Sequence, residues 1–137
     1  MKKIAFVVLA VIAYIHPLSA RAADFDGSKN LICASIETAG CVAGEKCLQG
    51  SAEMIGVPQF VKVNFKSNQI DAKRLNGEKI TAKIITKTRD KGQMILQGVN
   101  NNRSWSLVIS EKSGKMSLTA SGDQVVYVVF GACIPSS

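Results

Sequence analysis

The sequence predicts an all-β fold, a small antiparallel meander closed as a barrel, or as a sandwich, and stapled by disulfides. Turn signals recur at short intervals, near positions 67, 76, 91, 101, 113 and 122, as they do between short antiparallel strands. Apolar and polar residues alternate between these turns, which is the period of a strand and not of a helix. The four cysteines supply the staples. We expect eight or so strands, and closing the sheet would remove both of its edges.

Residues 1–22 have the pattern of a cleavable signal peptide. Two lysines give it a basic start, and an unbroken apolar run follows over residues 4–15. Ala20 and Ala22 form the small-x-small pattern that signal peptidase recognises, so we expect cleavage after Ala22 and, as the second choice, after Ala20. The apolar run is shorter than the roughly 20 residues of a membrane span. The sequence therefore predicts a periplasmic or secreted protein without a membrane span.

Cleavage would leave residues 23–137 as a single β domain, which is long enough to form its own core. The leader holds three basic residues, Lys2, Lys3 and Arg21, so that 14 basic residues face 10 acidic ones in the remainder. The resulting net charge of about +4 permits anionic partners without demanding them.

All four cysteines lie in this domain, at Cys33, Cys41, Cys47 and Cys133. An even number in an exported chain indicates disulfides, and four cysteines allow three pairings. We favour Cys41–Cys47, which closes a short loop, together with Cys33–Cys133, which ties the first strand to the last. By chain entropy, a bridge that closes about 100 residues is worth roughly 4–5 kcal/mol. No CxxC pair occurs, so we expect no metal site and no cofactor.

The first part of the domain alternates short strands with irregular chain. The expected elements are a loosely held polar lead-in (24–30), a strand (31–37), a short strand (46–51) and an irregular segment (52–58). Ser51 is placed to cap a single helical turn, which Gly56 and Pro58 would stop. We expect no long helix anywhere in the domain.

The second part repeats a regular pattern of strand and turn. Strands are expected over residues 60–66, 69–75, 79–89, 93–99, 103–110, 116–120 and 124–133. Asn76-Gly77 marks a hairpin, because both residues tolerate a positive φ. Residues 79–89 are predicted as one strand, with Ile80, Ala82 and Ile84 inward and Lys79, Thr81 and Lys83 outward.

The last strand is apolar on both of its faces. One face carries Val125, Tyr127 and Val129, and the other carries Val126, Val128 and Phe130. A strand with one face in water would alternate apolar with polar residues. We therefore expect cover on both faces. The segment 52–58 or a second sheet would supply it on the second face, with a homodimer partner as the next choice.

Several short motifs carry a resemblance to other proteins. They are Leu31-Ile-Cys33-Ala34, Pro58-Gln-Phe60, Leu96-Gln-Gly-Val99, Trp105-Ser106 and Phe130-Gly-Ala-Cys133. At these spacings the domain resembles, over nearly its whole length, an uncharacterised family of small exported bacterial β proteins with four cysteines. The resemblance implies a bacterial protein that is periplasmic or secreted. It implies no activity and no functional residue.

Histidine is missing from the predicted domain, because the single one, His16, lies in the leader. This excludes mechanisms that use a Ser-His or Cys-His pair, and it excludes imidazole ligands for a metal. The ten carboxylates lie mostly at turns and strand ends, and they show no calcium-loop or glycosidase signature. We therefore expect a protein that is not an enzyme, and we rank a hydrolase last among the functions.

Lysines gather on the polar side of neighbouring strands, at Lys62, Lys66, Lys79, Lys83 and Lys87. They are candidates for binding an anionic polymer, either a nucleic acid or a glycan. They are equally expected on an ordinary solvent-exposed sheet face, where lysines prevent sheets of different molecules from aggregating. Surfaces that bind single-stranded nucleic acid interleave aromatic residues on which the bases stack, and the polar positions here hold none. Nucleic acid is therefore not the partner we expect.

Trp105 and Tyr127 are the candidate ligand-binding residues. Trp105 shares a face with Leu107 and Ile109, so it belongs to the core or to the floor of a ligand cavity, and its indole N–H needs a partner when buried. Tyr127 has the same two interpretations. The function predicted from the sequence is a non-enzymatic binding module. It would hold a small apolar ligand inside the barrel or a protein at its rim, as a monomer or homodimer, and a binder of anionic polymers is the alternative.

Overall fold

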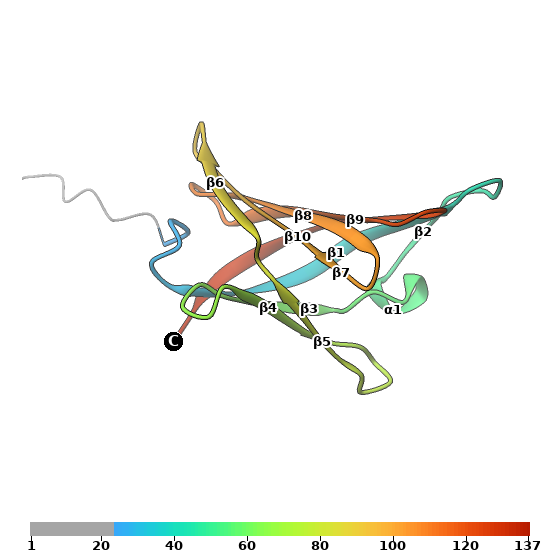
Figure 1. Ribbon diagram of the computed structural model, residues 1–137, viewed down its shortest axis with the longest axis horizontal. Helices are drawn as coiled ribbons and strands as arrows, with labels where there is room; N and C mark the ends of the chain where they lie inside the picture. The colour runs from blue at the N-terminus through green and yellow to red at the C-terminus, as the bar shows by residue number, and fades with distance from the viewer. Residues whose placement is uncertain (1–23) are drawn as a thin grey trace, which may run out of the picture.

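The computed structural model describes residues 24–137, so the predicted signal peptide and its cleavage site lie outside the described residues. The described part is almost entirely strand (Figure 1). Its elements are β1 (Asn30–Val42), β2 (Leu48–Gly50), α1 (Ala52–Ile55), β3 (Phe60–Asn64), β4 (Gln69–Lys73), β5 (Lys79–Lys83), β6 (Thr86–Asp90), β7 (Gln93–Asn100), β8 (Arg103–Ser110), β9 (Lys115–Ser121) and β10 (Val125–Ser136). The prediction of a β protein without a long helix is confirmed for these residues.

All strands belong to one antiparallel sheet. Its order is β5-β4-β3-β1-β10-β9-β8-β7-β6, and β2 adds to β1 beside β3. The sheet curls strongly (Figure 1), but its two ends, β5 and β6, do not pair with each other. The architecture is thus a half-barrel, an open curled sheet. The predicted antiparallel β sheet is confirmed, although the consecutive strands β5 and β6 are not neighbours as they would be in one meander. The strand pairing does not close the sheet into the predicted barrel.

The strand predicted over residues 79–89 is in fact two strands at opposite ends of the sheet. The backbone N–H of Ile84 donates to Asn68 O at 2.8 Å, next to β4, and the N–H of Ile85 donates to Gln97 O at 2.8 Å, on β7. The chain therefore crosses between the two ends of the sheet within two residues. Ile84 is buried and Ile85 is exposed. Two consecutive apolar residues therefore interrupt the alternation at the crossing, and residues 86–90 after it are all exposed. The prediction of one strand was wrong because it ran through this interruption.

The first and last strands form the centre of the sheet. β1 pairs with β10 from Asn30 opposite Ser136 to Val42 opposite Val125, with a bulge between Ser35 and Glu37. Gly131 is required at this bulge, because a Cβ there would collide with the carbonyl oxygen of Ala34. The predicted return of the last strand to the first is confirmed.

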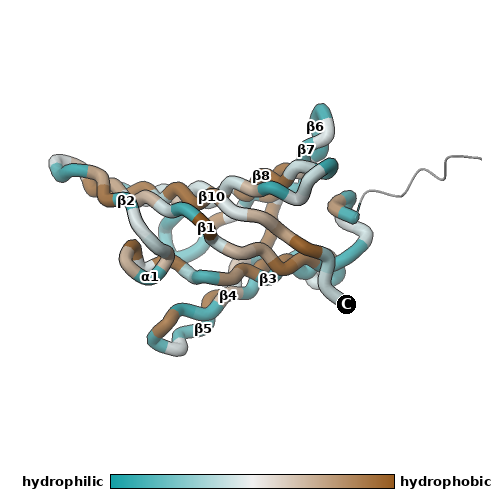
Figure 2. The backbone as a smooth tube through the Cα atoms, turned by 180° about the vertical axis from the view of Figure 1, so that it is seen from behind, coloured by the Kyte–Doolittle hydropathy of each residue, from teal (hydrophilic) through white to brown (hydrophobic). Residues whose placement is uncertain are grey.

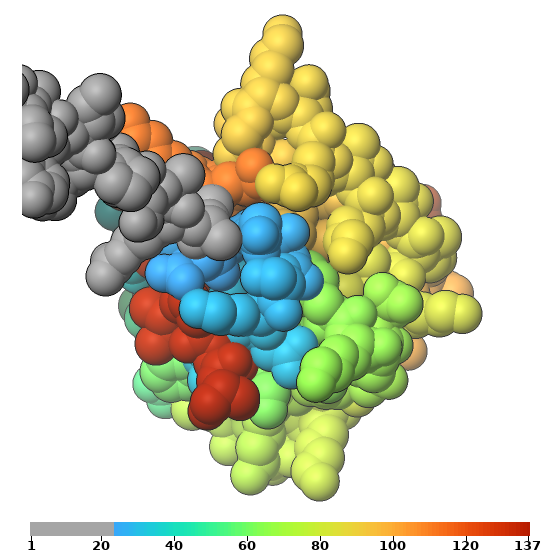
Figure 3. Space-filling view, turned by 90° about the vertical axis from the view of Figure 1, so that its left-hand side faces the viewer, coloured from blue at the N-terminus to red at the C-terminus, as the bar shows by residue number. Residues whose placement is uncertain are grey.

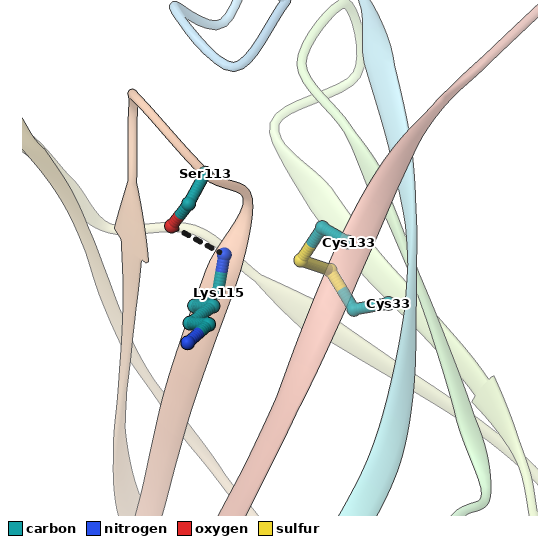
Figure 4. The surroundings of a disulfide bond; sticks show 4 residues. All are labelled: Cys33, Ser113, Lys115 and Cys133. Atoms are coloured by element: carbon teal, nitrogen blue, oxygen red, sulfur yellow. Dashed lines mark hydrogen bonds between the residues drawn. A yellow bond between two sulfur atoms is a disulfide. The ribbon is translucent and has the colours of Figure 1, made fainter.

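Two disulfides tie this central pair. Cys33 lies directly opposite Cys133, the two sulfur atoms are 2.04 Å apart, and both residues are buried (Figure 4). The turn before β9 lies beside this bridge, where the Lys115 N–H donates to Ser113 Oγ at 3.3 Å. The second bridge joins Cys41 to Cys47, between β1 and β2. Both pairings are the ones favoured from the sequence, and the described residues contain no free cysteine.

The helical turn predicted after Ser51 is confirmed as α1. The Ser51 side chain accepts a hydrogen bond from the Met54 N–H at 3.2 Å, and Gly56 ends the helix with a φ of 77°. Ser35 fastens the chain that follows, because its Oγ donates to Pro58 O at 2.8 Å. A Cβ added to Gly40 would lie 3.2 Å from Ile55 Cγ2 and 3.4 Å from Tyr127 Cδ1. The segment therefore covers the inner face of β1 and β10.

This placement corrects the expectation for the outer face of the last strand. Segment 52–58 does not cover it, and no second sheet lies among the described residues. Val126 and Val128 are half-buried, whereas Phe130 is 52% exposed. Apolar segments run along β1 and β10 in Figure 2. The prediction of internal cover was wrong because Val and Phe are favoured in strands even where one face meets water.

Residues 24–29 are not the loosely held lead-in that was expected. Phe25 packs against the core, the Ser28 N–H donates to Asp26 Oδ1 at 2.8 Å, and Lys29 Nζ lies 2.9 Å from Asp24 Oδ1. In Figure 3 this blue segment lies between the red C-terminal residues and the green and yellow strands. It covers the end of the curled sheet where β1 begins and β10 ends. We call this the closed end and the opposite one the open end.

Candidate ligand-binding pocket

A pocket of about 180 Å³ lies inside the curve of the sheet at the open end. For comparison, a dry cavity of about 150 Å³ is large enough to bind benzene. Most of the lining is apolar, and it comes from the α1–β3 connection and from strands on both sides of the sheet. The apolar lining residues are Gly56, Val57, Pro58, Val61, Ile70, Ala72, Ile80, Ala82, Trp105, Met116, Leu118, Ala120 and Val129. A site of this size and character suits one small apolar molecule.

A row of alternating small and large residues forms one wall of the pocket. It crosses five adjacent strands, and each member lies directly opposite the next: Gly98 (β7), Trp105 (β8), Ala120 (β9), Tyr127 (β10) and Gly40 (β1). Three of these, Trp105, Ala120 and Tyr127, line the pocket. The small neighbours leave room for the two aromatic rings. The structure thus brings together both ligand-binding candidates of the sequence, Trp105 and Tyr127.

Gly98 shows how tightly this wall is built. A Cβ at this position would lie 2.5 Å from Trp105 Cζ2 and would also collide with the carbonyl oxygen of Lys83. The end of β5 therefore crosses directly over β7 here, and only glycine permits the close approach. The indole ring of Trp105 lies directly against the backbone of Gly98.

Large side chains fill the sheet beyond the pocket, toward the closed end. One row there consists of Leu96, Leu107, Leu118 and Val129, and the next begins with Met94, Ile109 and Met116. Leu96, Met94 and Ile109 have no exposed surface. Opposite the aromatic wall, β4 and β5 contribute the small residues Ala72 and Ala82. The pocket lies where small residues alternate with Trp105 and Tyr127, whereas the rows toward the closed end consist mainly of large apolar side chains.

Polar residues gather at the pocket mouth. Arg74 follows β4, Asn100 and Asn101 lie at the β7–β8 turn, and Arg103 begins β8. Among all residues that line the pocket, the two arginines alone carry a charge. The Arg103 guanidinium lies 5.5 Å from the centre of the Tyr127 ring, in a cation–π contact. The mouth is therefore electropositive.

Two donors at this site lack a hydrogen-bond partner. The indole Nε1 of Trp105 is buried and unpaired, and so is Nε of Arg74. Arg74 Nε lies 3.5 Å from Glu78 Oε2, which is an ion pair without a hydrogen bond. A buried donor without a partner costs about 1–3 kcal/mol. The need of Trp105 for a partner, expected from the sequence, is not met within residues 24–137.

The structure separates the lysines that the sequence grouped. Lys62, Lys79 and Lys83 lie on the outer face of β3 to β5, and Lys66 lies in the β3–β4 turn. Lys87 lies elsewhere, with its Nζ 5.3 Å from the centre of the Phe65 ring near the closed end. All five lysines are exposed.

The lysine-bearing face also differs from expectation in its aromatic content. Phe60 lies two residues before Lys62 on the same side of β3, and it is 59% exposed. An acidic residue interrupts the face as well, because Asp71 lies opposite Lys62 and accepts a hydrogen bond from Thr81 Oγ1 at 2.8 Å. The expectation that no aromatic residue occupies this face was wrong.

Sequence reasoning did not identify the arginines or the small residues of the pocket. Arg74 and Arg103 each adjoin a turn, which is the position of many ordinary surface charges. Ala120 and Gly98 are small residues, and a small residue within a strand does not by itself indicate a pocket. No local signal distinguishes them, because their role depends on which residues lie opposite.

Within residues 24–137 no cluster of His, Cys, Asp or Glu side chains is arranged to hold a metal ion. The same residues include no helix that is long and apolar enough to cross a membrane. Comparison of the chain with protein-family models, curated proteins and solved structures finds no match. The resemblance to small exported β proteins therefore stays a prediction.

Proposed function

We propose that the protein is an exported, non-enzymatic binding module that holds a small apolar ligand in the pocket at the open end of its sheet. The observation that carries the proposal is the row in which Trp105 and Tyr127 alternate with small residues. Two large aromatic faces beside a small apolar volume suit the binding of one small molecule, with a few polar groups at the mouth to orient it.

The polar groups of the pocket support binding rather than catalysis. Ser35 is the one hydroxyl-bearing aliphatic residue of the lining, and its Oγ already donates to Pro58 O. No carboxylate and no lysine lines the pocket to act as a base. Nucleophilic catalysis needs a nucleophile within hydrogen-bond reach of a base, and the lining residues supply no such pair.

Export is part of the proposal. Two disulfides are consistent with an oxidising compartment, because cytosolic thiols are kept reduced. The predicted signal peptide then makes the periplasm or the exterior the site of action.

The first test is titration of the purified protein with toluene. Calorimetry measures the affinity, and the emission of Trp105, the single tryptophan of the chain, reports contact with the pocket wall. We expect saturable binding at one site and a shift of the emission. The variant Ala120→Leu places a large side chain between Trp105 and Tyr127, and we expect it to abolish binding.

The matched control is Ala132→Leu, which adds the same side chain on β10 but on the outer face, opposite Lys115. This variant should bind toluene like the natural protein. Absence of saturable binding, or equal loss in both variants, would contradict the proposal. Native mass spectrometry of protein purified from its own compartment adds a second measurement, in which a retained small mass supports it.

A partner protein is the second candidate, favoured by the exposed apolar face of the central strands. Ile32 lies opposite Ile134, and Ala34 lies between Ala132 and Phe60. Ile134 and Phe60 are 64% and 59% exposed. Sedimentation of the natural protein and of Phe60→Ser tests for a homodimer through this face. A monomer at all concentrations would exclude that form of the proposal.

An anionic polymer remains the weaker alternative. Lys62, Lys79 and Lys83 share a face, but Asp71 divides them and Lys87 lies apart. Binding through lysines falls steeply with salt. Failure of heparin to retain the protein at low ionic strength would exclude this alternative.

A further inference from the structure

We propose that the natural ligand is a small amphipathic carboxylate, with its apolar body in the pocket and its carboxylate at the arginine-bearing mouth. This inference rests on the proposed function, because it names the chemical class of ligand for the same pocket. Charge, unpaired donors and volume each support it.

The two charged residues that line the pocket are both arginines, and the nearby carboxylate of Glu78 lies outside the lining. Arg74 and Arg103 approach the mouth from different turns, and no acidic residue lines the pocket. Arg103 forms no ion pair within residues 24–137; its guanidinium is held over the Tyr127 ring instead. A planar guanidinium fork binds a carboxylate through two parallel hydrogen bonds. An arginine held in place by an aromatic ring and free of a carboxylate partner is suited to that role.

The unpaired donors indicate a ligand with acceptor atoms. Arg74 Nε is buried and makes no hydrogen bond, although Glu78 Oε2 lies 3.5 Å away. Trp105 Nε1 is a second buried donor without a partner. Both residues line the pocket. Carboxylate oxygens accept hydrogen bonds and donate none, so they complement a site whose unpaired groups are donors.

The volume of the pocket limits the size of the ligand's apolar part. About 180 Å³ corresponds to one aromatic ring with a substituent, or to roughly six to eight carbon atoms, when compared with the benzene-sized cavity of about 150 Å³. Long-chain fatty acids are too large for it. Aromatic and short branched acids fit, and the rings of Trp105 and Tyr127 favour an aromatic body.

The test compares ligands that differ in charge but not in shape. Benzoate and benzamide are nearly isosteric, and toluene provides the apolar body alone. We expect benzoate to bind at least about tenfold more tightly than benzamide by calorimetry, since a charged hydrogen bond is worth roughly twice a neutral one. Phenyl phosphate is the fourth probe, and we expect it to bind less tightly than benzoate.

Substitutions at the pocket mouth test whether the two arginines cause the preference for benzoate. Arg103→Gln and Arg74→Gln should each weaken benzoate about tenfold or more, and should weaken toluene by a much smaller factor, because toluene has no carboxylate for the guanidinium to bind. Glu78→Gln removes the competing carboxylate beside Arg74 and should tighten benzoate binding. Lys79→Gln removes a positive charge from the outer face of the sheet and serves as the matched control, with no expected change.

The possible failures are distinguishable. Equal affinity for benzoate and benzamide, or benzoate binding that neither arginine variant weakens, would overturn the carboxylate assignment. Tighter binding of phenyl phosphate than of benzoate would overturn it in favour of a phosphate ester. In these cases, saturable toluene binding that Ala120→Leu abolishes would leave the proposed function standing. If neither toluene nor benzoate binds, the proposed function itself is wrong.

Discussion

The closed and open ends of the sheet are built from the same strands but have opposite interiors. At the closed end, Met94, Leu96 and Ile109 have no exposed surface, and Phe25 seals the opening. At the open end, the same strands place Gly98 and Trp105 inward, around a pocket of about 180 Å³. The inward residues are mostly apolar at both ends, so polarity does not distinguish them. Small residues placed beside the aromatic rings distinguish the binding site from the packed core.

Arg89 near the closed end and Arg103 at the open end differ in whether an acidic residue pairs with them. Near the closed end, Arg89 forms an ion pair with Glu111, and the hydrogen bond to Glu111 raises the pKa of the Arg89 guanidinium. At the open end, Arg103 has no acidic partner within the described residues. A paired cation maintains the fold locally, whereas a cation without an acidic partner beside a pocket is available to a ligand. We expect stability to depend on the closed end and binding on the open end.

The largest difference between the ends should come from their disulfides. Replacing Cys33 and Cys133 with alanine frees a loop of 100 residues and should cost about 4–5 kcal/mol of unfolding free energy. Replacing Cys41 and Cys47 frees a loop of only 6 residues and should cost about 2 kcal/mol by the same chain-entropy relation. Urea unfolding of the two double variants measures both values. Equal losses would show that loop length does not set the contribution of each bridge.

Two isoleucines allow a matched comparison of packing. Ile109 is fully buried toward the closed end, whereas Ile80 is half-buried at the pocket. Ile109→Ala should destabilise by about 2–5 kcal/mol, because it opens a cavity in a filled core. Ile80→Ala only widens an existing pocket, so we expect about 1 kcal/mol or less. Thermal unfolding provides the comparison, and a larger loss at Ile80 would overturn the assignment of the packed end.

A further comparison concerns Gly98, in the row of residues that forms the pocket wall. In Gly98→Ala the new Cβ must displace Trp105 or the Lys83 carbonyl group, which should cost about 1–3 kcal/mol. The displacement should also shift the emission of Trp105.

Gly50→Ala is the control for that variant, since its new Cβ would meet only the flexible end of Met54. We expect this change to stay within about 0.5 kcal/mol, as for most substitutions that flexible neighbours absorb. Unchanged stability and emission in Gly98→Ala would mean that β5 does not press on β7 as closely as the structure indicates.

Local patterns predicted most of the elements but not their partners. Ser51 and Gly56 marked α1 correctly, because capping depends only on neighbouring residues. The adjacent isoleucines Ile84 and Ile85 interrupt the alternation where the chain crosses from one end of the sheet to the other, but a local interruption does not reveal which strands lie on either side of it. The outer face around Phe130 looked like core for a related reason, since apolar residues in a strand do not reveal whether another layer exists.

By itself, the sequence determined that this chain forms an antiparallel β sheet, and it favoured the two cysteine pairs that the sheet contains. Turn chemistry and period-two alternation act over a few residues, and the order of the strands brings the ends of the chain together. Only the tertiary structure decided where a pocket lies and which charges border it. Gly40 is far along the chain from Gly98 and Trp105, and the three residues belong to one wall because strand pairing aligns them in a single row.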